Sequence, residues 1–284
     1  MTGRGGSFGA HGPARADAAA IDLIDAFCDA VPRRLGRAEP HGPLVLFVTE
    51  GQGWSYYARP RRPPREPVTA EHLRGLRARQ RELGVQESFE WIEQTAPEFA
   101  VAARAAALEV AAHPLMLLDG PARHAGPPAG VTVRAVPADE PDLASIVSVP
   151  SVAFAHPGTG TGPAGSAERD KLAAERSAAR IARSRGLLAA GHSVLAAAFG
   201  ADGPLAAGSC QMVGGVAEIT GVGTLPSARR RGLGAAVTAQ LAELAIGRGT
   251  HTVFLSASDE EVARVYAGIG FRRIGTAMIA EAPR

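Results

Sequence analysis

One segment of the chain combines residue types that bind phosphate groups. Residues 220–235 read TGVGTLPSARRRGLGA, so a strand of small residues leads through a proline turn into arginines and glycines. Apolar residues then recur at the spacing of a helix: Leu233, Val237, Leu241 and Leu244. Gly232 and Gly234 let a ligand approach the main chain, and the free N–H groups of the first helical turn face an anion. The segment therefore predicts a pyrophosphate site.

Three consecutive arginines, Arg229, Arg230 and Arg231, stand beside the predicted start of this helix. Positive charge opposes the helix dipole at this end unless an anion is bound there. The alternative interpretation is a tight turn followed by a solvated arginine run. The position of the charge favours the anion site.

The predicted elements around this segment alternate strands with helices. From residue 131 onward we expect strands at 131–136, 193–199, 205–213, 216–224, 252–256 and 274–280, and helices at 139–154, 167–185, 232–246 and 259–267. Glycines at 200–203 and 214–215 are typical of hairpin turns, so the three strands from 193 to 224 form an antiparallel meander.

Residues 131–284 resemble an N-acetyltransferase domain of the GNAT superfamily. The motifs that carry the resemblance are Arg229-x-x-Gly232-x-Gly234 after Pro226, and Tyr266 followed by Gly270-Phe271. The resemblance implies an α/β (α+β) fold, in which helices flank a mixed, mainly antiparallel twisted sheet. It also implies acetyl-CoA as co-substrate and no metal.

The resemblance places the contacts to acetyl-CoA on the strand at 216–224 and on the loop after it. In the family this strand separates from its neighbour, and its backbone pairs with the pantetheine arm. Gly221 and Gly223 suit that pairing, and they also fit a weak or bulged strand. Asp259 stands where an asparagine is common in the family, and Val262 where alanine is usual. The implied contacts are Val222, Gly223, Thr224, Arg229, Arg230, Arg231, Gly232, Leu233, Gly234, Ala235 and Asp259.

Two residues match family positions with catalytic roles. Glu218 lies within an otherwise apolar strand, where many members have a general base that takes a proton from the acceptor amine. Strand alternation places its side chain on the face of Thr220, Val222 and Thr224. Tyr266 matches the tyrosine that protonates the departing thiolate. The structural alternatives are a solvent-facing strand residue for Glu218 and a packing residue for Tyr266.

The first half predicts strands at 44–49, 55–58, 88–92 and 114–118, with helices at 70–83 and 97–108. The order strand-helix-strand-helix-strand repeats the second half of the C-terminal domain, but the motifs do not repeat. Residues 61–65 read RRPPR where the glycine loop should be, and Ala103 falls where the tyrosine would be needed. We therefore expect two tandem GNAT-like domains, the first degenerate and non-catalytic. An unrelated α/β accessory domain is the alternative.

The proline and glycine content of residues 120–130 marks the domain boundary. We expect a disordered lead-in at 1–18, a degenerate GNAT-like or accessory domain at 19–119, a linker at 120–130 and a catalytic domain at 131–284.

Composition limits the class of partner and the compartment. The net charge of +2 over 284 residues does not indicate a nucleic-acid partner. Cys28 and Cys210 form no disulfide framework or zinc motif, and no apolar run approaches a membrane span. We expect a cytoplasmic monomer or homodimer.

These features together predict an acyl-CoA-dependent N-acetyltransferase. Its reaction is transfer of an acetyl group from acetyl-CoA to a primary amine of a small molecule or peptide, by direct attack in a ternary complex. The alternative is a non-catalytic protein that binds acyl-CoA or has a regulatory role.

Overall fold

The computed structural model describes residues 13–49, 56–64, 66–124 and 126–283. The first half contains α1 (Pro13–Leu35), β1 (Gly36–His41), β2 (Leu44–Thr49), β3 (Arg59–Pro60), α2 (Ala70–Glu82), β4 (Ser88–Ile92), α3 (Phe99–Ala105) and β5 (Glu109–Leu118). The second half contains β6 (Thr132–Val136), α4 (Leu143–Ala155), α5 (Ser166–Glu175), α6 (Ala178–Ala189), β7 (Ser193–Gly200), β8 (Gly203–Val213), β9 (Val216–Thr224), the 3₁₀ turn η1 (Pro226–Ala228), α7 (Leu233–Ile246), β10 (Thr252–Ser256), α8 (Glu260–Ile269) and β11 (Phe271–Glu281).

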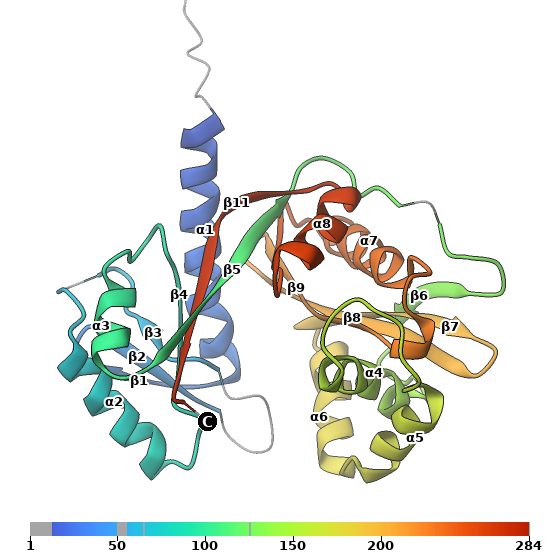
Figure 1. Ribbon diagram of the computed structural model, residues 1–284, viewed down its shortest axis with the longest axis horizontal. Helices are drawn as coiled ribbons and strands as arrows, with labels where there is room; N and C mark the ends of the chain where they lie inside the picture. The colour runs from blue at the N-terminus through green and yellow to red at the C-terminus, as the bar shows by residue number, and fades with distance from the viewer. Residues whose placement is uncertain (1–12, 50–55, 65, 125, 284) are drawn as a thin grey trace, which may run out of the picture.

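One eight-stranded sheet contains strands from both halves, in the order β4-β11-β5-β10-β9-β8-β7-β6. Its neighbouring strands are antiparallel except for β9 and β10, which are parallel. Strand β5 of the first half lies between β10 and β11 of the second, and the long strands β5 and β11 connect the two sides of the molecule (Figure 1). The sheet therefore continues across the predicted linker at 120–130, and the domain boundaries stay a prediction.

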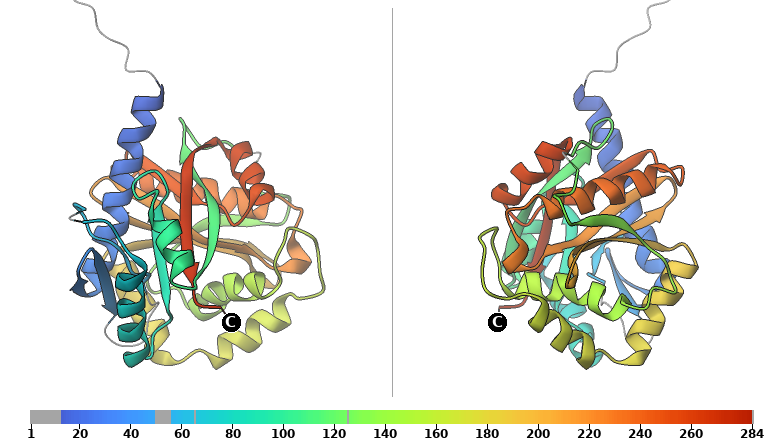
Figure 2. Two further views of the ribbon diagram at one scale, coloured as in Figure 1. Left: turned by 60° about the vertical axis from the view of Figure 1, so that its left-hand side comes forward. Right: turned by 90° about the vertical axis from the view of Figure 1, so that its right-hand side faces the viewer.

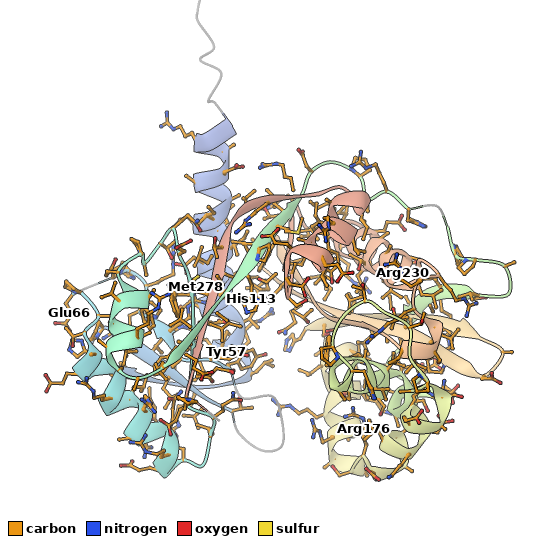
Figure 3. The ribbon with its side chains drawn as sticks, viewed as in Figure 1. Tyr57, Glu66, His113, Arg176, Arg230 and Met278 are labelled. Atoms are coloured by element: carbon orange, nitrogen blue, oxygen red, sulfur yellow. The ribbon has the colours of Figure 1, made fainter. Side chains whose placement is uncertain are left out.

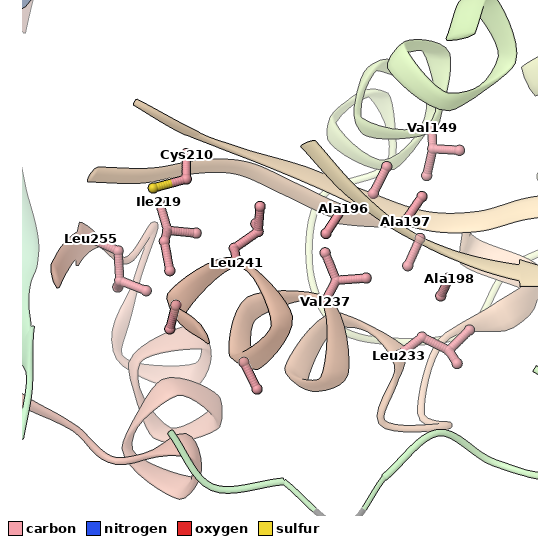
Figure 4. Packing of buried hydrophobic residues seen from close by; sticks show 14 of the residues in the cluster. Val149, Ala196, Ala197, Ala198, Cys210, Ile219, Leu233, Val237, Leu241 and Leu255 are labelled. Atoms are coloured by element: carbon pink, nitrogen blue, oxygen red, sulfur yellow. The ribbon is translucent and has the colours of Figure 1, made fainter. Parts of the chain in front are cut away.

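Helices cover both faces of the sheet in the second half. Val237 and Leu241 of α7 pack below the strands, and Val149 of α4 packs above them (Figure 4). Between them β7 carries the alanines 196–198, all fully buried, whose short side chains let a helix approach closely on either face. The mixed, mostly antiparallel sheet with flanking helices confirms the fold class predicted from the sequence.

Helix α1 packs on the part of the sheet where the two halves meet. Its apolar residues form one core cluster with side chains from β4, β5, β9 and β10. The smaller sheet of β1, β2 and β3, in blue, lies beside the lower end of this helix (Figure 2, left). The helix begins at Pro13, so the expectation of a disordered lead-in is wrong for residues 13–18; residues 1–12 lie outside the described part of the chain.

Two other elements differ from the expectation. The helix predicted at 167–185 is two helices, because Arg176 is extended and Ser177 caps α6 by accepting a hydrogen bond from the Arg180 N–H. Of the strand predicted at 55–58, Ser55 lies outside the described residues, and Ala58 forms only an isolated bridge to Phe89.

Candidate active site

Strand β9 separates from β10 halfway along its length. The two strands pair only through residues 216–218 of β9 and 252–254 of β10, the last pair being Glu218 with Phe254. Beyond this pair, residues 219–224 have no partner on β10. Their backbone on that side is therefore available to a ligand that pairs like an added strand.

A bulge lies in the same part of β9. Ser209 of β8 pairs with Thr220, but Ala207 pairs with Gly223, so Gly221 and Val222 lie opposite Gly208 alone. Gly221 has a φ of 62°, a left-handed conformation that favours glycine. Strand β9 is therefore bulged, as the alternative interpretation of Gly221 and Gly223 predicted.

Because of the bulge, the side chains of β9 do not all lie on the faces of the sheet that strand alternation predicts. Glu218 and Thr220 share a face with Ser209, whose Oγ lies 2.9 Å from the Thr220 Oγ1. A Cβ at Gly208 would lie 2.8 Å from the Val222 Cγ2 and 3.1 Å from Leu241 of α7, so Val222 faces α7 instead. Thr224 also turns toward α7, with its Oγ1 3.3 Å from a Cβ placed at Gly234. The expectation that Val222 and Thr224 share the Glu218 face is wrong, because the extra residue reverses the alternation.

A cavity of about 700 Å³ opens where β9 and β10 separate. It brings together seven of the residues predicted from the sequence: Glu218, Val222, Gly223, Thr224, Arg229, Asp259 and Tyr266. The predicted residues 230–235 do not line it. Two residues of its opposite wall, His113 and Met278, lie on β5 and β11 in Figure 3, and Tyr57 of the segment before β3 lies near them, whereas Arg230 lies on the far side beside α7.

The Glu218 carboxyl group is ready to hold a proton at neutral pH. Burial and, to a smaller extent, the nearby Glu90 carboxylate raise its pKa to about 8, against the opposing effect of the Arg59 guanidinium. Among the described residues, none donates a hydrogen bond to the carboxylate or forms an ion pair with it. A pKa near the working pH is what a general base needs.

Tyr266 lies on α8 at the other side of the cavity. Its ring packs edge-on against Phe271, with the centroids 6.1 Å apart. Burial raises the pKa of its phenol to about 12, so the hydroxyl keeps its proton. Tyr266 therefore has a proton to donate at neutral pH.

Asp259 lies in the same wall of the cavity and stabilises the start of α8. Its Oδ1 accepts a hydrogen bond of 2.9 Å from the Val262 N–H and so caps α8, and its Oδ2 accepts one from the Ser258 hydroxyl. The capping N–H groups lower the pKa of the carboxyl group, so it stays ionised. A cofactor contact through Asp259 stays a prediction.

The start of α7 has the conformation of an anion site. Arg230 has a φ of 64° and Gly232, at the N-cap, has a φ of 75°; no side chain caps the helix. The side chains of Arg230 and Arg231 are exposed and, in the described part of the chain, have no hydrogen bond or ion pair. Leu233 is only 1% exposed and belongs to the core. Backbone N–H groups and two free guanidinium groups are thus left for a ligand.

Arg229 differs from its two neighbours. Its guanidinium donates to four carbonyl oxygens, those of Ala153, His156, Gly160 and Thr224, at 2.6–3.3 Å. These bonds fix the loop between α4 and α5 against the end of β9. The structure thus uses the Arg229 side chain to position the loop, and its predicted contact to the cofactor stays a prediction.

The first half contributes charged residues to the cavity that the sequence analysis did not identify. Arg59, 1% exposed, pairs with Asp25 of α1 and lies 3.3 Å from the Glu90 Oε1. Cys28 lines the cavity as well, and burial raises the pKa of its thiol. Glu90 had a readable signal, because it is a single carboxylate inside the apolar strand SFEWI, as Glu218 is in its own strand.

The arginines at 61–65, predicted to replace the glycine loop in the first half, are used internally. Arg61 donates to the Gly42 carbonyl, and Arg62 pairs with Asp22 and Asp25. Arg65 lies outside the described residues. Ala103 is fully buried in α3. The first half thus offers no free guanidinium at Arg61 or Arg62 comparable with those beside α7.

Comparisons with known proteins give the class of fold. Residues 200–279 match the family model of the FR47-like proteins, a span that includes Glu218, the start of α7 and Tyr266. A GCN5-related N-acetyltransferase from Kribbella flavida is 23% identical, with 97% of each chain covered and a TM-score of 0.64. A tandem GNAT protein from the clavulanic acid biosynthesis pathway is 15% identical, with 95% of this chain and 97% of that one covered and a TM-score of 0.53. A search of curated proteins found no significant match.

The chain therefore has the fold of the GCN5-related N-acetyltransferases over nearly its whole length. Within that fold, residues 200–279 are the part of the chain that matches the FR47-like family model. The resemblance predicted from the sequence is confirmed in this respect, and the tandem GNAT neighbour fits a layout of two domains.

Two searches of the described residues complete the description of the site. No group of three or more His, Cys, Asp or Glu side chains there is arranged to hold a metal ion. None of the described helices has the length and apolar character needed to cross a membrane.

Proposed function

We propose that the protein is an N-acetyltransferase that moves an acetyl group from acetyl-CoA to a primary amine of a small molecule or peptide. The observation that carries the proposal is the cavity at the separation of β9 and β10, which has Glu218 on one wall and Tyr266 on another. An acyl transfer to an amine needs a base and an acid on either side of the reacting atoms.

Three features of the chain fit acetyl-CoA. The backbone of residues 219–224 has no β10 partner, which suits the pantetheine amides. The uncapped start of α7 suits the pyrophosphate, and the free side chains of Arg230 and Arg231 suit the phosphate charge. Acetyl-CoA supplies the activated thioester. We therefore assign it as the co-substrate.

The residues of the cavity have distinct parts in the reaction. Glu218 takes a proton from the acceptor ammonium, and the amine nitrogen then forms a bond to the thioester carbon. Backbone N–H groups in residues 222–224 polarise the carbonyl group. As the carbon–sulfur bond breaks, Tyr266 donates its proton to the sulfur, and the second proton leaves the attached nitrogen and restores the Tyr266 hydroxyl. The products are the N-acetyl amide and free CoA, and no covalent enzyme intermediate forms.

Two measurements test the proposal. Acetyl-CoA at about a hundred times its Kd should stabilise the protein by about 2.7 kcal/mol in thermal unfolding. With a panel of amines and acetyl-CoA, free CoA thiol and an N-acetylated product should appear together. No stabilisation and no CoA release would contradict the proposal. Stabilisation without CoA release from any amine would favour the non-catalytic acyl-CoA-binding alternative.

A further inference from the structure

Helix α1 forms a wall over the face of the sheet that carries Glu218. Four of its apolar residues, Ile21, Ile24, Phe27 and Val31, pack with Ile92 of β4, Leu115 of β5, Phe254 of β10 and Val216 of β9. The rings of Phe27 and Phe254 meet edge-on with their centroids 5.3 Å apart. Because the four partners come from four strands, α1 crosses the sheet and joins the two halves of the molecule (Figure 1).

Glu90 and Glu218 lie on this same face. In a strand, residues two apart point the same way, so Glu90 accompanies Ile92 and Glu218 accompanies Val216. Both glutamates line the one cavity, Glu90 from the first half and Glu218 from the second. The helix therefore encloses two carboxylates that come from opposite halves of the chain.

Carboxylates outnumber cations around these two residues. Arg59 is shared between Asp25 and Glu90, and Arg62 is shared between Asp22 and Asp25. Glu218 has no partner among the described residues. Two guanidinium groups thus face four carboxylates. Burial raises the pKa of Glu90, and the Arg59 guanidinium opposes this shift.

The walls between the two carboxylates are mainly apolar. They include Ile24, Ile92, Leu115, Phe254 and Met278, and Glu90 itself remains 30% exposed in its side chain. A carboxylate that is reachable from an apolar cavity and only partly neutralised attracts a cation with a hydrocarbon body.

We propose that the first half forms the acceptor subsite, in which Glu90 holds the ammonium group of a compact amine that has an apolar body and no anionic group. This inference rests on the proposed function, because it names the acceptor class for the same cavity. An acceptor with a carboxylate or phosphate close to its amine would bring a like charge next to Glu90 and be rejected. Glu90 is thus a specificity-determining residue supplied by the half that lacks the GNAT motifs.

The test uses amines in matched pairs that differ by one carboxylate: phenethylamine with phenylalanine, isoamylamine with leucine, and tryptamine with tryptophan. Binding to the full chain is measured by calorimetry, and turnover by CoA release at saturating acetyl-CoA. We expect at least one amine to bind at least about tenfold more tightly than its carboxylated partner, the discrimination that one charge contact provides.

Glu90→Gln should raise the Kd and KM of that amine about tenfold and lower kcat far less than Glu218→Gln does, since Glu90 binds the ammonium group and Glu218 takes its proton. Glu90→Asp keeps the charge and should keep the preference for the amine. The matched control is Glu93→Gln, an exposed residue just beyond the same strand, which should change neither constant.

Three results would overturn the inference: no amine of the panel binds, the carboxylated partners bind equally well, or Glu90→Gln leaves Kd and KM unchanged. These outcomes are distinct from failure of the proposed function, in which amines bind but no CoA is released. Because binding is measured without turnover, it tests the subsite in either case.

Discussion

The two walls of the cavity each carry one glutamate inside an apolar strand, but the surroundings of the two glutamates differ. Glu218 belongs to the last pair between β9 and β10, and its carboxyl group has no partner among the described residues. Glu90 lies in the edge strand β4, 3.3 Å from a buried arginine that is itself paired with α1. An unpartnered carboxyl group with a pKa near 8 can exchange a proton at neutral pH. A carboxylate beside a guanidinium is better suited to hold a cation.

This difference suggests a division of labour between the halves of the chain. The second half supplies the reacting groups and the anion site, and the first half supplies α1 and the acceptor wall. Variants of the second-half wall should therefore change kcat or the use of acetyl-CoA. Variants of the first-half wall should change the KM of the acceptor.

The largest effect is expected for Glu218→Gln. Loss of the base should lower kcat about 10²- to 10⁴-fold, because the amide cannot take the amine proton. Steady-state kinetics with the best amine of the panel measures the effect. Glu175→Gln, which changes an exposed carboxylate at the end of α5, is the matched control and should match the wild type. Unchanged kcat in Glu218→Gln would remove the base from the mechanism.

A smaller effect is expected for Tyr266→Phe. The variant keeps the ring contact with Phe271 and removes only the proton that the sulfur receives. We expect kcat to fall about 10- to 100-fold, toward the lower end of general acid catalysis, with the KM of acetyl-CoA unchanged. Tyr56→Phe serves as the control, because Tyr56 bonds Gln211 outside the cavity. Equal rates in the two variants would show that the Tyr266 hydroxyl is not the acid.

The smallest kinetic effect concerns the arginines before α7. Arg230→Ala should raise the KM of acetyl-CoA several-fold to about tenfold, more at low salt, and leave the melting temperature unchanged, because its side chain has no partner among the described residues.

Arg229→Lys should instead lower the stability of the protein. It loses most of four hydrogen bonds to carbonyl oxygens and should lower the melting temperature by about 5–10 °C. If Arg229→Lys leaves the melting temperature unchanged, Arg229 does not anchor the loop.

Local sequence patterns were sufficient to predict most strands and helices of the second half. Alternating apolar residues gave β9 and β10 with their observed bounds, and helical spacing gave α7, because these signals lie within one element. The resemblance to the GNAT family, and not these local patterns, selected Glu218 and Tyr266, which the structure brings to one cavity. The bulge at Gly221 was only one of two alternatives, since it depends on how β8 and β9 pair.

The first half was less predictable because its structure depends on distant contacts. Nothing local in β5 indicates that it pairs with both β10 and β11. Helix α1 did leave a signal in Ile21, Ile24, Phe27 and Val31, which follow a helical spacing, but their partners lie on four strands far along the chain. The proximity of Glu90 to Glu218 follows from both features, and so could not be seen in the sequence.

The most direct test of the central claim is the pH dependence of kcat/KM in the wild type and in Glu218→Gln. Glu218 must be ionised to act, and burial together with Glu90 raises its pKa to about 8. The wild-type value should therefore rise about tenfold per pH unit from pH 6 and level off above about pH 8. The variant should be slow and lack this rise. A wild-type profile that is flat between pH 6 and 9, or the same rise in Glu218→Gln, would contradict the assignment of Glu218 as the base.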